Sequence, residues 1–160
     1  MGGLRTVDAW TGALLPRHPG SRSLEDWNDM TAPGLEEQIL RLRRRDRRYR
    51  RYAYEFVLEA LDHTIAHTGR LWSAGEERHV TGRELLDGLR ALAVERFGPL
   101  AKLVLNHWGV TRTEDFGEIV FGLVEIGLLN RHPGDSRLDF ADGYDFEKVF
   151  ERDYRPALPW

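Results

Sequence analysis

Two histidines four residues apart are the first side chains whose types and spacing could carry chemistry. His63 and His67 would share one face of a helix, where two imidazoles can bind a single metal ion. With Asp62 and His79 as further ligands, they would define a metal-dependent hydrolase or lyase. The glutamate that directly follows the first histidine in zinc proteases is absent here. A helix C-terminus, whose dipole favours histidine, is the simpler interpretation, and we expect no cofactor.

A run of arginines over residues 41–51 is the strongest single feature of the sequence. The segment RLRRRDRRYRR has eight arginines and one aspartate, a formal charge of +7. On a helix these arginines would surround most of the circumference and would form a phosphate-binding girdle. Tyr49 and Tyr52 could stack on unpaired bases, which favours RNA over duplex DNA. The candidate residues for RNA or an acidic partner are Arg41, Arg43, Arg44, Arg45, Arg47, Arg48, Tyr49, Arg50 and Arg51.

Other interpretations of the arginine run stay open. Residues 113–154 hold eleven acidic residues against four basic ones, a formal charge of −7, so the two segments could balance each other within the chain. An acidic protein is a further possible partner. Because Lys102 and Lys148 are the only lysines, the abundance of arginine could also reflect a GC-rich genome.

The composition excludes several classes of function. A chain of 160 residues with 41% hydrophobic and 31% charged residues is typical of one globular domain. Without cysteine it has no disulfide, thiol nucleophile or iron–sulfur ligand. The phosphate-loop and serine-hydrolase motifs GxGxxG, GxxxxGK[ST] and GxSxG do not occur. With no long apolar stretch and no signal-peptide pattern, we predict a soluble cytoplasmic protein without a membrane partner.

The spacing of apolar residues predicts a mainly helical chain. Residues 35–42 predict one helix, and residues 54–65 predict a second helix or its bent continuation. Thr81 and Glu84 form a capping box that predicts a helix over 81–97. Helices over 99–108 and 113–126, the latter capped by Thr111 or Thr113, and a hairpin over 128–140 complete the pattern. The predicted fold is mainly α, a single domain with a winged-helix-like helix-turn-helix core and a C-terminal β-hairpin.

The chain divides into three predicted regions. Residues 1–34 contain Pro16, Pro19 and Pro33 without a sustained apolar period, which predicts a disordered leader. Met30 could be the true start of translation. Residues 35–155 are expected to form the domain, and residues 156–160 a tail.

The predicted helix over 113–126 begins with acidic residues where a DNA-reading helix would have basic or amide residues. Glu114, Asp115 and Glu118 would repel phosphates, which argues against sequence-specific binding of duplex DNA. Tyr144 is expected to dock on the core, and Asp145 to cap a turn. The candidate residues for contact with a protein partner are Glu114, Asp115, Glu118, Glu125, Tyr144 and Asp145.

Several segments between Arg51 and Phe150 resemble a known family. They are YAYEFVLEALDHT, HVTGRELLDGLR, FGPLA, LNHWGV, TEDFGEIVFGLVEIGLL and DGYDFEKVF. On these segments the chain is similar to the Minf_1886 family of small bacterial proteins of unknown function. The resemblance implies a small, mainly helical protein and no established activity. In that family the region of the arginine run is more mixed in charge, so the resemblance implies that nucleic-acid binding through these arginines is particular to this sequence and is not a property of the family.

Taken together, the sequence predicts a non-enzymatic cytoplasmic accessory protein that makes protein or ribonucleoprotein contacts. RNA or the ribosome, or an unidentified protein, would be its partner. A metal-dependent hydrolase or lyase and a DNA-binding transcription regulator are the alternatives.

Overall fold

A computed structural model describes residues 24–73 and 75–155, with only the backbone described for residues 24–33, 75 and 76. Within this part the chain is helical and contains no strand, which confirms the mainly α class. The α-helices are α1 (Leu24–Arg45), α2 (Arg51–His67), α3 (Gly82–Phe97), α4 (Ala101–His107) and α5 (Thr113–Glu125). Shorter turns are the 3₁₀ turns η1 (Gly75–Arg78), η2 (Gly98–Leu100) and η3 (Arg137–Phe140) and the π-helical turn η4 (Lys148–Arg152).

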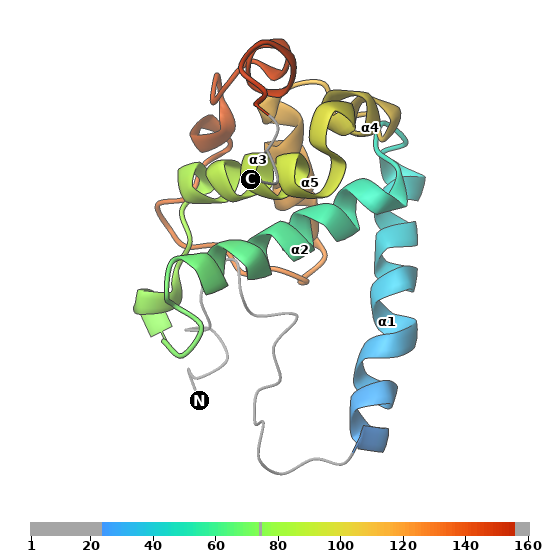
Figure 1. Cartoon of the computed structure of the whole chain (residues 1–160). Coiled ribbons are helices and arrows are strands. Elements are labelled where there is room, and N and C mark those ends of the chain that lie inside the picture. Colours follow the sequence, from blue (N-terminus) through green and yellow to red (C-terminus); the bar gives the residue numbers. More distant parts are fainter. Residues whose placement is uncertain (1–23, 74, 156–160) are drawn as a thin grey trace.

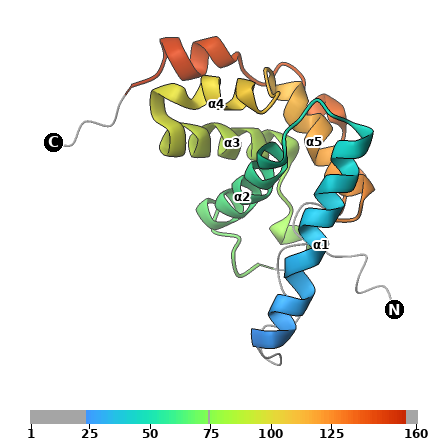
Figure 2. The ribbon, with the colours of Figure 1, turned by 90° about the vertical axis from the view of Figure 1, so that its right-hand side faces the viewer.

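Helix α2 lies at the centre of the fold and packs against α3 and α5 (Figure 1). Helix α1 runs along one side and joins α2 through a short connection near the end of α4 (Figures 1 and 2). The core is formed by apolar faces that the helical spacing predicted. Fully buried members include Ile39, Val57, Leu61, Leu85, Leu89, Leu105, Ile119 and Val120. No helix in the described part of the chain is long and apolar enough to cross a membrane.

The predicted hairpin over residues 128–140, and with it the wing of a winged helix, is wrong. Leu129 packs into the core, and the carboxylate of Asp135 accepts a hydrogen bond from the backbone N–H of His132 at 2.7 Å, which closes a turn. Ser136 then caps η3, and Asp139 accepts from the Ser136 N–H at 2.8 Å. The alternation of polar and apolar residues over 136–140 suggested a strand. The same residues contain a capping box, which is a signal for a helical turn.

Helix α1 begins at Leu24, so the predicted disorder of residues 24–34 is also wrong. The helix continues through Pro33, where we expected proline to prevent it. Glu25 and Asp26, acidic residues that favour a helix N-terminus, were the signal that we missed. Met30 lies within α1, and its role as a start stays a prediction. Residues 1–23 of the leader and 156–160 of the tail lie outside the described residues.

The start of α3 confirms the predicted capping box. The Thr81 hydroxyl accepts from the Glu84 N–H at 3.2 Å, and the Glu84 carboxylate accepts from the Thr81 N–H at 2.9 Å. Arg70 donates to both oxygens of Glu84, at 3.0 and 2.7 Å. Gly98 ends α3, and Pro99 lies in η2, so the next α-helix begins at Ala101 rather than at residue 99.

The Arg70–Glu84 pair makes the stability of the fold depend on pH. Its hydrogen bonds hold the pKa of Glu84 at about 2, below its ordinary value of 4.5. Because the folded pKa is the lower one, ionised Glu84 stabilises the fold above pH 4.5, and this contribution is lost as the pH falls toward 2. We expect the unfolding free energy of Glu84→Gln, measured with urea, to fall less over this range than that of the wild type. Equal falls would contradict this role.

Candidate functional site

The arginine run is divided between two helices and a loop, and it does not form the predicted helical girdle. Helix α1 ends at Arg45, and α2 begins at Arg51. Residues 46–50 between them form a loop that we call the arginine loop. The carboxylate of Asp46 accepts from the backbone N–H of Arg48 at 3.0 Å and from its guanidinium at 2.6 Å. This hydrogen bond to Arg48 lowers the pKa of Asp46, so the loop has its own internal anion.

The end of α4 holds the arginine loop in place. The backbone N–H of Arg50 donates to the Trp108 carbonyl at 3.0 Å, and its Nε donates to the His107 carbonyl at 3.1 Å. Gly109 allows this approach, because a Cβ there would lie 2.0 Å from the Arg48 carbonyl oxygen. The loop is thus fixed at its backbone, while its arginines, Arg47, Arg48 and Arg50, are exposed.

Tyr49 is a second anchor, and the prediction that it stacks on bases is wrong. Its side chain is buried, and its hydroxyl donates to Oδ1 of Asp115 at 2.7 Å. Arg43 Nε donates to its carbonyl at 3.3 Å. Burial, together with Asp115, raises the pKa of the Tyr49 hydroxyl. A tyrosine among arginines suggested an exposed side chain, whereas the turn directs it into the core.

Carboxylates pair with four of the eight arginines, which makes the predicted internal charge balance partial. Only Arg45 and Arg48 reach acidic residues of the 113–154 segment, and the other partners are local. The ion pairs are Arg41–Glu37 (2.9 Å), Arg45–Glu125 (3.5 Å), Arg48–Asp46 (2.6 Å), Arg48–Glu118 (3.7 Å), Arg51–Glu36 (3.6 Å) and Arg51–Glu55 (3.1 Å).

The other four arginines form no ion pair with any described residue. We call them the uncompensated arginines: Arg43, Arg44, Arg47 and Arg50. Arg43 and Arg50 donate to backbone carbonyls, which leaves their charge unbalanced. Arg44 and Arg47 are exposed and make no hydrogen bond within the described ranges. Arg43 and Arg44 lie in the last turn of α1, and Arg47 and Arg50 lie in the loop that follows it. Figure 1 shows this junction of α1 and α2.

The four carboxylates of α5 that we predicted to face a protein partner are used within the chain. Asp115 accepts from the N–H groups of Thr111 and Arg112, at 2.9 and 3.2 Å, so it supplies the cap that we had assigned to a threonine. Glu114 accepts from the Asp142 N–H at 3.1 Å. Glu118 pairs with Arg48 and Arg137, and Glu125 pairs with Arg45. They do not form a free acidic face.

Tyr144 and Asp145 adopt the predicted structural roles. The Tyr144 hydroxyl donates to the Leu86 carbonyl at 3.0 Å, and burial raises its pKa. Asp145 caps the following turn by accepting from the Lys148 N–H at 2.9 Å. Both line a cavity of about 410 Å³.

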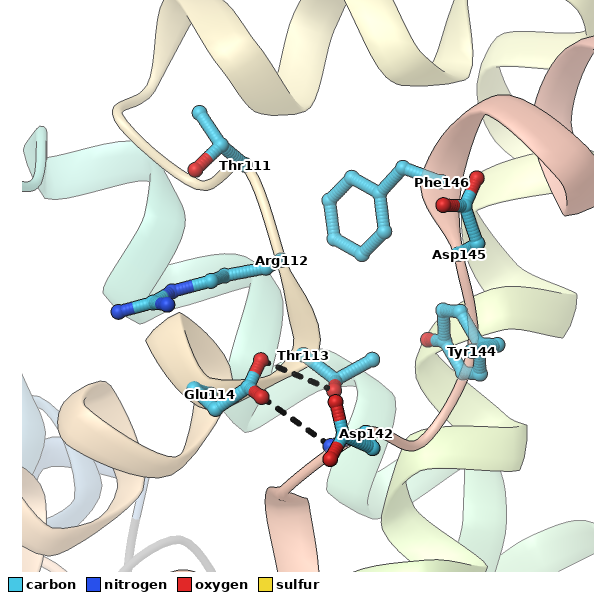
Figure 3. Close-up of a pocket in the computed structure, with 8 residues that line it drawn as sticks. All are labelled: Thr111, Arg112, Thr113, Glu114, Asp142, Tyr144, Asp145 and Phe146. Atoms are coloured by element: carbon cyan, nitrogen blue, oxygen red, sulfur yellow. Dashed lines mark hydrogen bonds between the residues drawn. The ribbon is translucent and has the colours of Figure 1, made fainter.

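This cavity opens beside the start of α5 (Figure 3). Glu114 bonds to Thr113 and Asp142 at its wall, whereas the Arg112 side chain extends away from Asp145 and Phe146. All the residues that line the cavity except Phe146 have polar side chains. Two of them, Glu114 and Asp145, already accept hydrogen bonds from backbone N–H groups of the fold.

The predicted metal ligands are not brought together. The rings of His63 and His67 stack at 3.9 Å, and His67 Nδ1 donates to the His63 carbonyl at 2.9 Å. His79 instead lies 3.3 Å from the Asp135 carboxylate, and Asp62 is exposed. No group of three or more potential ligands in the described residues has the geometry of a metal site. The structure gives the metal-dependent alternative no assembled site.

The sequence patterns did not indicate that the end of α4 lies beside the arginine loop. Tyr52 stacks on Trp108 with ring centroids 6.3 Å apart, and Tyr52 stays 54% exposed. Gly109, with φ of 93°, was the available signal, because a glycine after a helix often marks a close approach of two backbones. The sequence around Gly109 does not show which segment of backbone approaches it.

Comparison of the chain with family models, curated proteins and solved structures found no match. The resemblance to the Minf_1886 family therefore stays a prediction.

Proposed function

We propose that this chain is a cytoplasmic, non-enzymatic accessory protein that binds RNA phosphates through the arginine loop and the last turn of α1 before it. The observation that carries this proposal is the group of four uncompensated arginines within residues 43–50. A guanidinium group matches the oxygens of a phosphate with paired donors and keeps its charge at every physiological pH. Contacts of this kind supply most of the affinity of sequence-independent binding.

The fixed backbone of the loop supports binding, because the arginines are positioned before a ligand arrives. Tyr49 and Arg50 already hold the loop to Asp115 and to the end of α4. Binding then orders side chains only, which reduces its entropic cost.

This surface is better suited to binding RNA than to sequence-specific recognition of duplex DNA. A helix that reads bases presents basic or amide side chains to the major groove. Helix α5 carries Glu114, Asp115 and Glu118 at its start, and all three are engaged within the chain. The positive charge lies beside this helix and not on it.

The variant Arg44→Gln/Arg47→Gln tests the proposal. We expect it to bind RNA at least about tenfold more weakly, and equally so for unrelated sequences, since each lost charge-assisted hydrogen bond contributes roughly 1.5–3 kcal/mol. Fluorescence anisotropy with labelled RNA measures this change. Both side chains are exposed and make no hydrogen bond or ion pair with another described residue, so the fold is expected to stay intact.

Arg41→Gln/Arg45→Gln is the matched control. It removes the same charge from the same segment, but both arginines are ion-paired in the free protein. It is expected to bind RNA with nearly wild-type affinity. Equal losses in the two variants would show that only overall charge matters and would contradict an assigned site.

A further inference from the structure

We infer that the RNA at the arginine loop is single-stranded there, with unpaired bases packing on an exposed aromatic and leucine surface of α2 and α4. This inference rests on the proposed function and adds the class of RNA that is bound. We call Tyr52, Leu100, Leu103 and Trp108 the platform.

Tyr52 and Trp108 form the end of the platform next to the arginine loop. Their rings stack with an offset, at 6.3 Å between centroids and 29° between planes. The guanidinium of Arg51 lies 5.3 Å from the Tyr52 ring centre. With both neighbours in place, 54% of Tyr52 still faces solvent. Offset rings leave part of a face open, and a nucleobase can stack there.

The other two members of the platform are Leu100, the last residue of η2, and Leu103 of α4. They are 56% and 66% exposed, although leucine is a residue that folding normally buries. Being three residues apart, they lie on one side of the chain, and Ala101 and Leu105 occupy the buried side. These two exposed leucines are available for contact with a ligand.

The platform and the uncompensated arginines meet at the end of α4. Arg50 donates to the His107 carbonyl, and Trp108 is the next residue. A strand that places its phosphates on Arg47 and Arg50 can therefore place a neighbouring base on the exposed ring of Tyr52, beside the half-buried Trp108. In a duplex the base faces are stacked inside the helix and unavailable, so only unpaired nucleotides use both parts of the surface.

The inference is tested with Tyr52→Ala and three probes. These are a labelled RNA of about 12 nucleotides without self-complementarity, the duplex of the same sequence, and heparin, a polyanion without bases. We expect wild-type protein to bind the single strand more tightly than the duplex. Tyr52→Ala is expected to bind the single strand about tenfold more weakly and heparin with unchanged affinity.

Two variants serve as controls. Tyr52→Phe keeps the ring and is expected to bind the single strand within about twofold of the wild type, since stacking needs the ring and not the hydroxyl. Trp72→Ala removes an aromatic side chain that is 93% exposed and lies outside the platform. It is expected to leave the affinity for the single strand unchanged.

The possible results separate the two proposals. No loss with Tyr52→Ala, or an equal loss on heparin, would overturn the platform and leave the arginine contacts standing. Absence of salt-dependent RNA binding by the wild type would overturn the proposed function, and the platform with it. A same-sequence DNA strand that binds more tightly than RNA would overturn the assignment to RNA.

Discussion

Gly109→Ala is expected to destabilise the fold by roughly 3–5 kcal/mol, the sum of a steric clash and a strained backbone. The new Cβ would lie 2.0 Å from the carbonyl oxygen of Arg48 and 3.0 Å from its carbonyl carbon. The residue also has a φ of 93°, which an L side chain rarely adopts. The opposing atoms belong to the backbone of the arginine loop, which Tyr49 and Arg50 hold in place. They therefore cannot move away by a rotamer change, as a side chain could.

Gly127→Ala separates the two causes. Gly127 has a similar φ of 80°, but no atom lies within 4 Å of the position that its Cβ would take. The cost there should be only the backbone strain, about 1–2 kcal/mol. Urea denaturation of both variants measures the difference. Equal costs would show that the loop does not approach α4 as closely as the structure indicates.

Asp115→Ala is expected to cost about 3 kcal/mol, because one carboxylate performs two tasks. Its Oδ2 accepts from the N–H groups of Thr111 and Arg112 at the start of α5, and its Oδ1 accepts from the buried Tyr49 hydroxyl. Removing it takes away a helix cap and leaves that hydroxyl without its acceptor. Thermal or urea unfolding would measure the loss of stability.

Two comparisons make this prediction specific. Tyr49→Phe removes only the hydroxyl, so it should cost less than Asp115→Ala, by the amount that the cap contributes. Glu125→Ala removes a carboxylate from an exposed pair at 3.5 Å and should cost at most about 0.5 kcal/mol. If Asp115→Ala cost no more than Glu125→Ala, Asp115 would be a surface residue, as the sequence suggested.

The sequence predicted those features that local patterns determine. Apolar spacing located α2, α3 and α5 to within a few residues, and Thr81 with Glu84 identified the start of α3. These signals succeed because a helical face and a capping box lie within a short stretch of chain. The hairpin prediction failed although its signal was local, because Ser136 and Asp139 form a capping box whose spacing also fits strand alternation.

The candidate site depended on contacts between distant residues, and so only part of it was predictable. The sequence indicated the arginine run as a candidate site, but Tyr49 and Asp115 are 66 residues apart, and no local pattern shows that they bond. Because of this single contact, neither Tyr49 nor Asp115 is available for the binding surface to which the sequence assigned it. The pairing of individual arginines likewise depends on where α5 lies, which decides that Arg45 and Arg48 are neutralised while Arg44 and Arg47 are not.

The salt dependence of RNA binding tests the central claim most directly. If the four uncompensated arginines contact phosphates, the logarithm of the affinity should fall with the logarithm of salt concentration with a slope of about −3, from about 0.7 per contact. Arg44→Gln/Arg47→Gln should reduce the magnitude of this slope by about 1.4, and Arg41→Gln/Arg45→Gln should leave it unchanged. An affinity of the wild type that does not vary with salt, or the same slope in both variants, would contradict phosphate binding at the arginine loop.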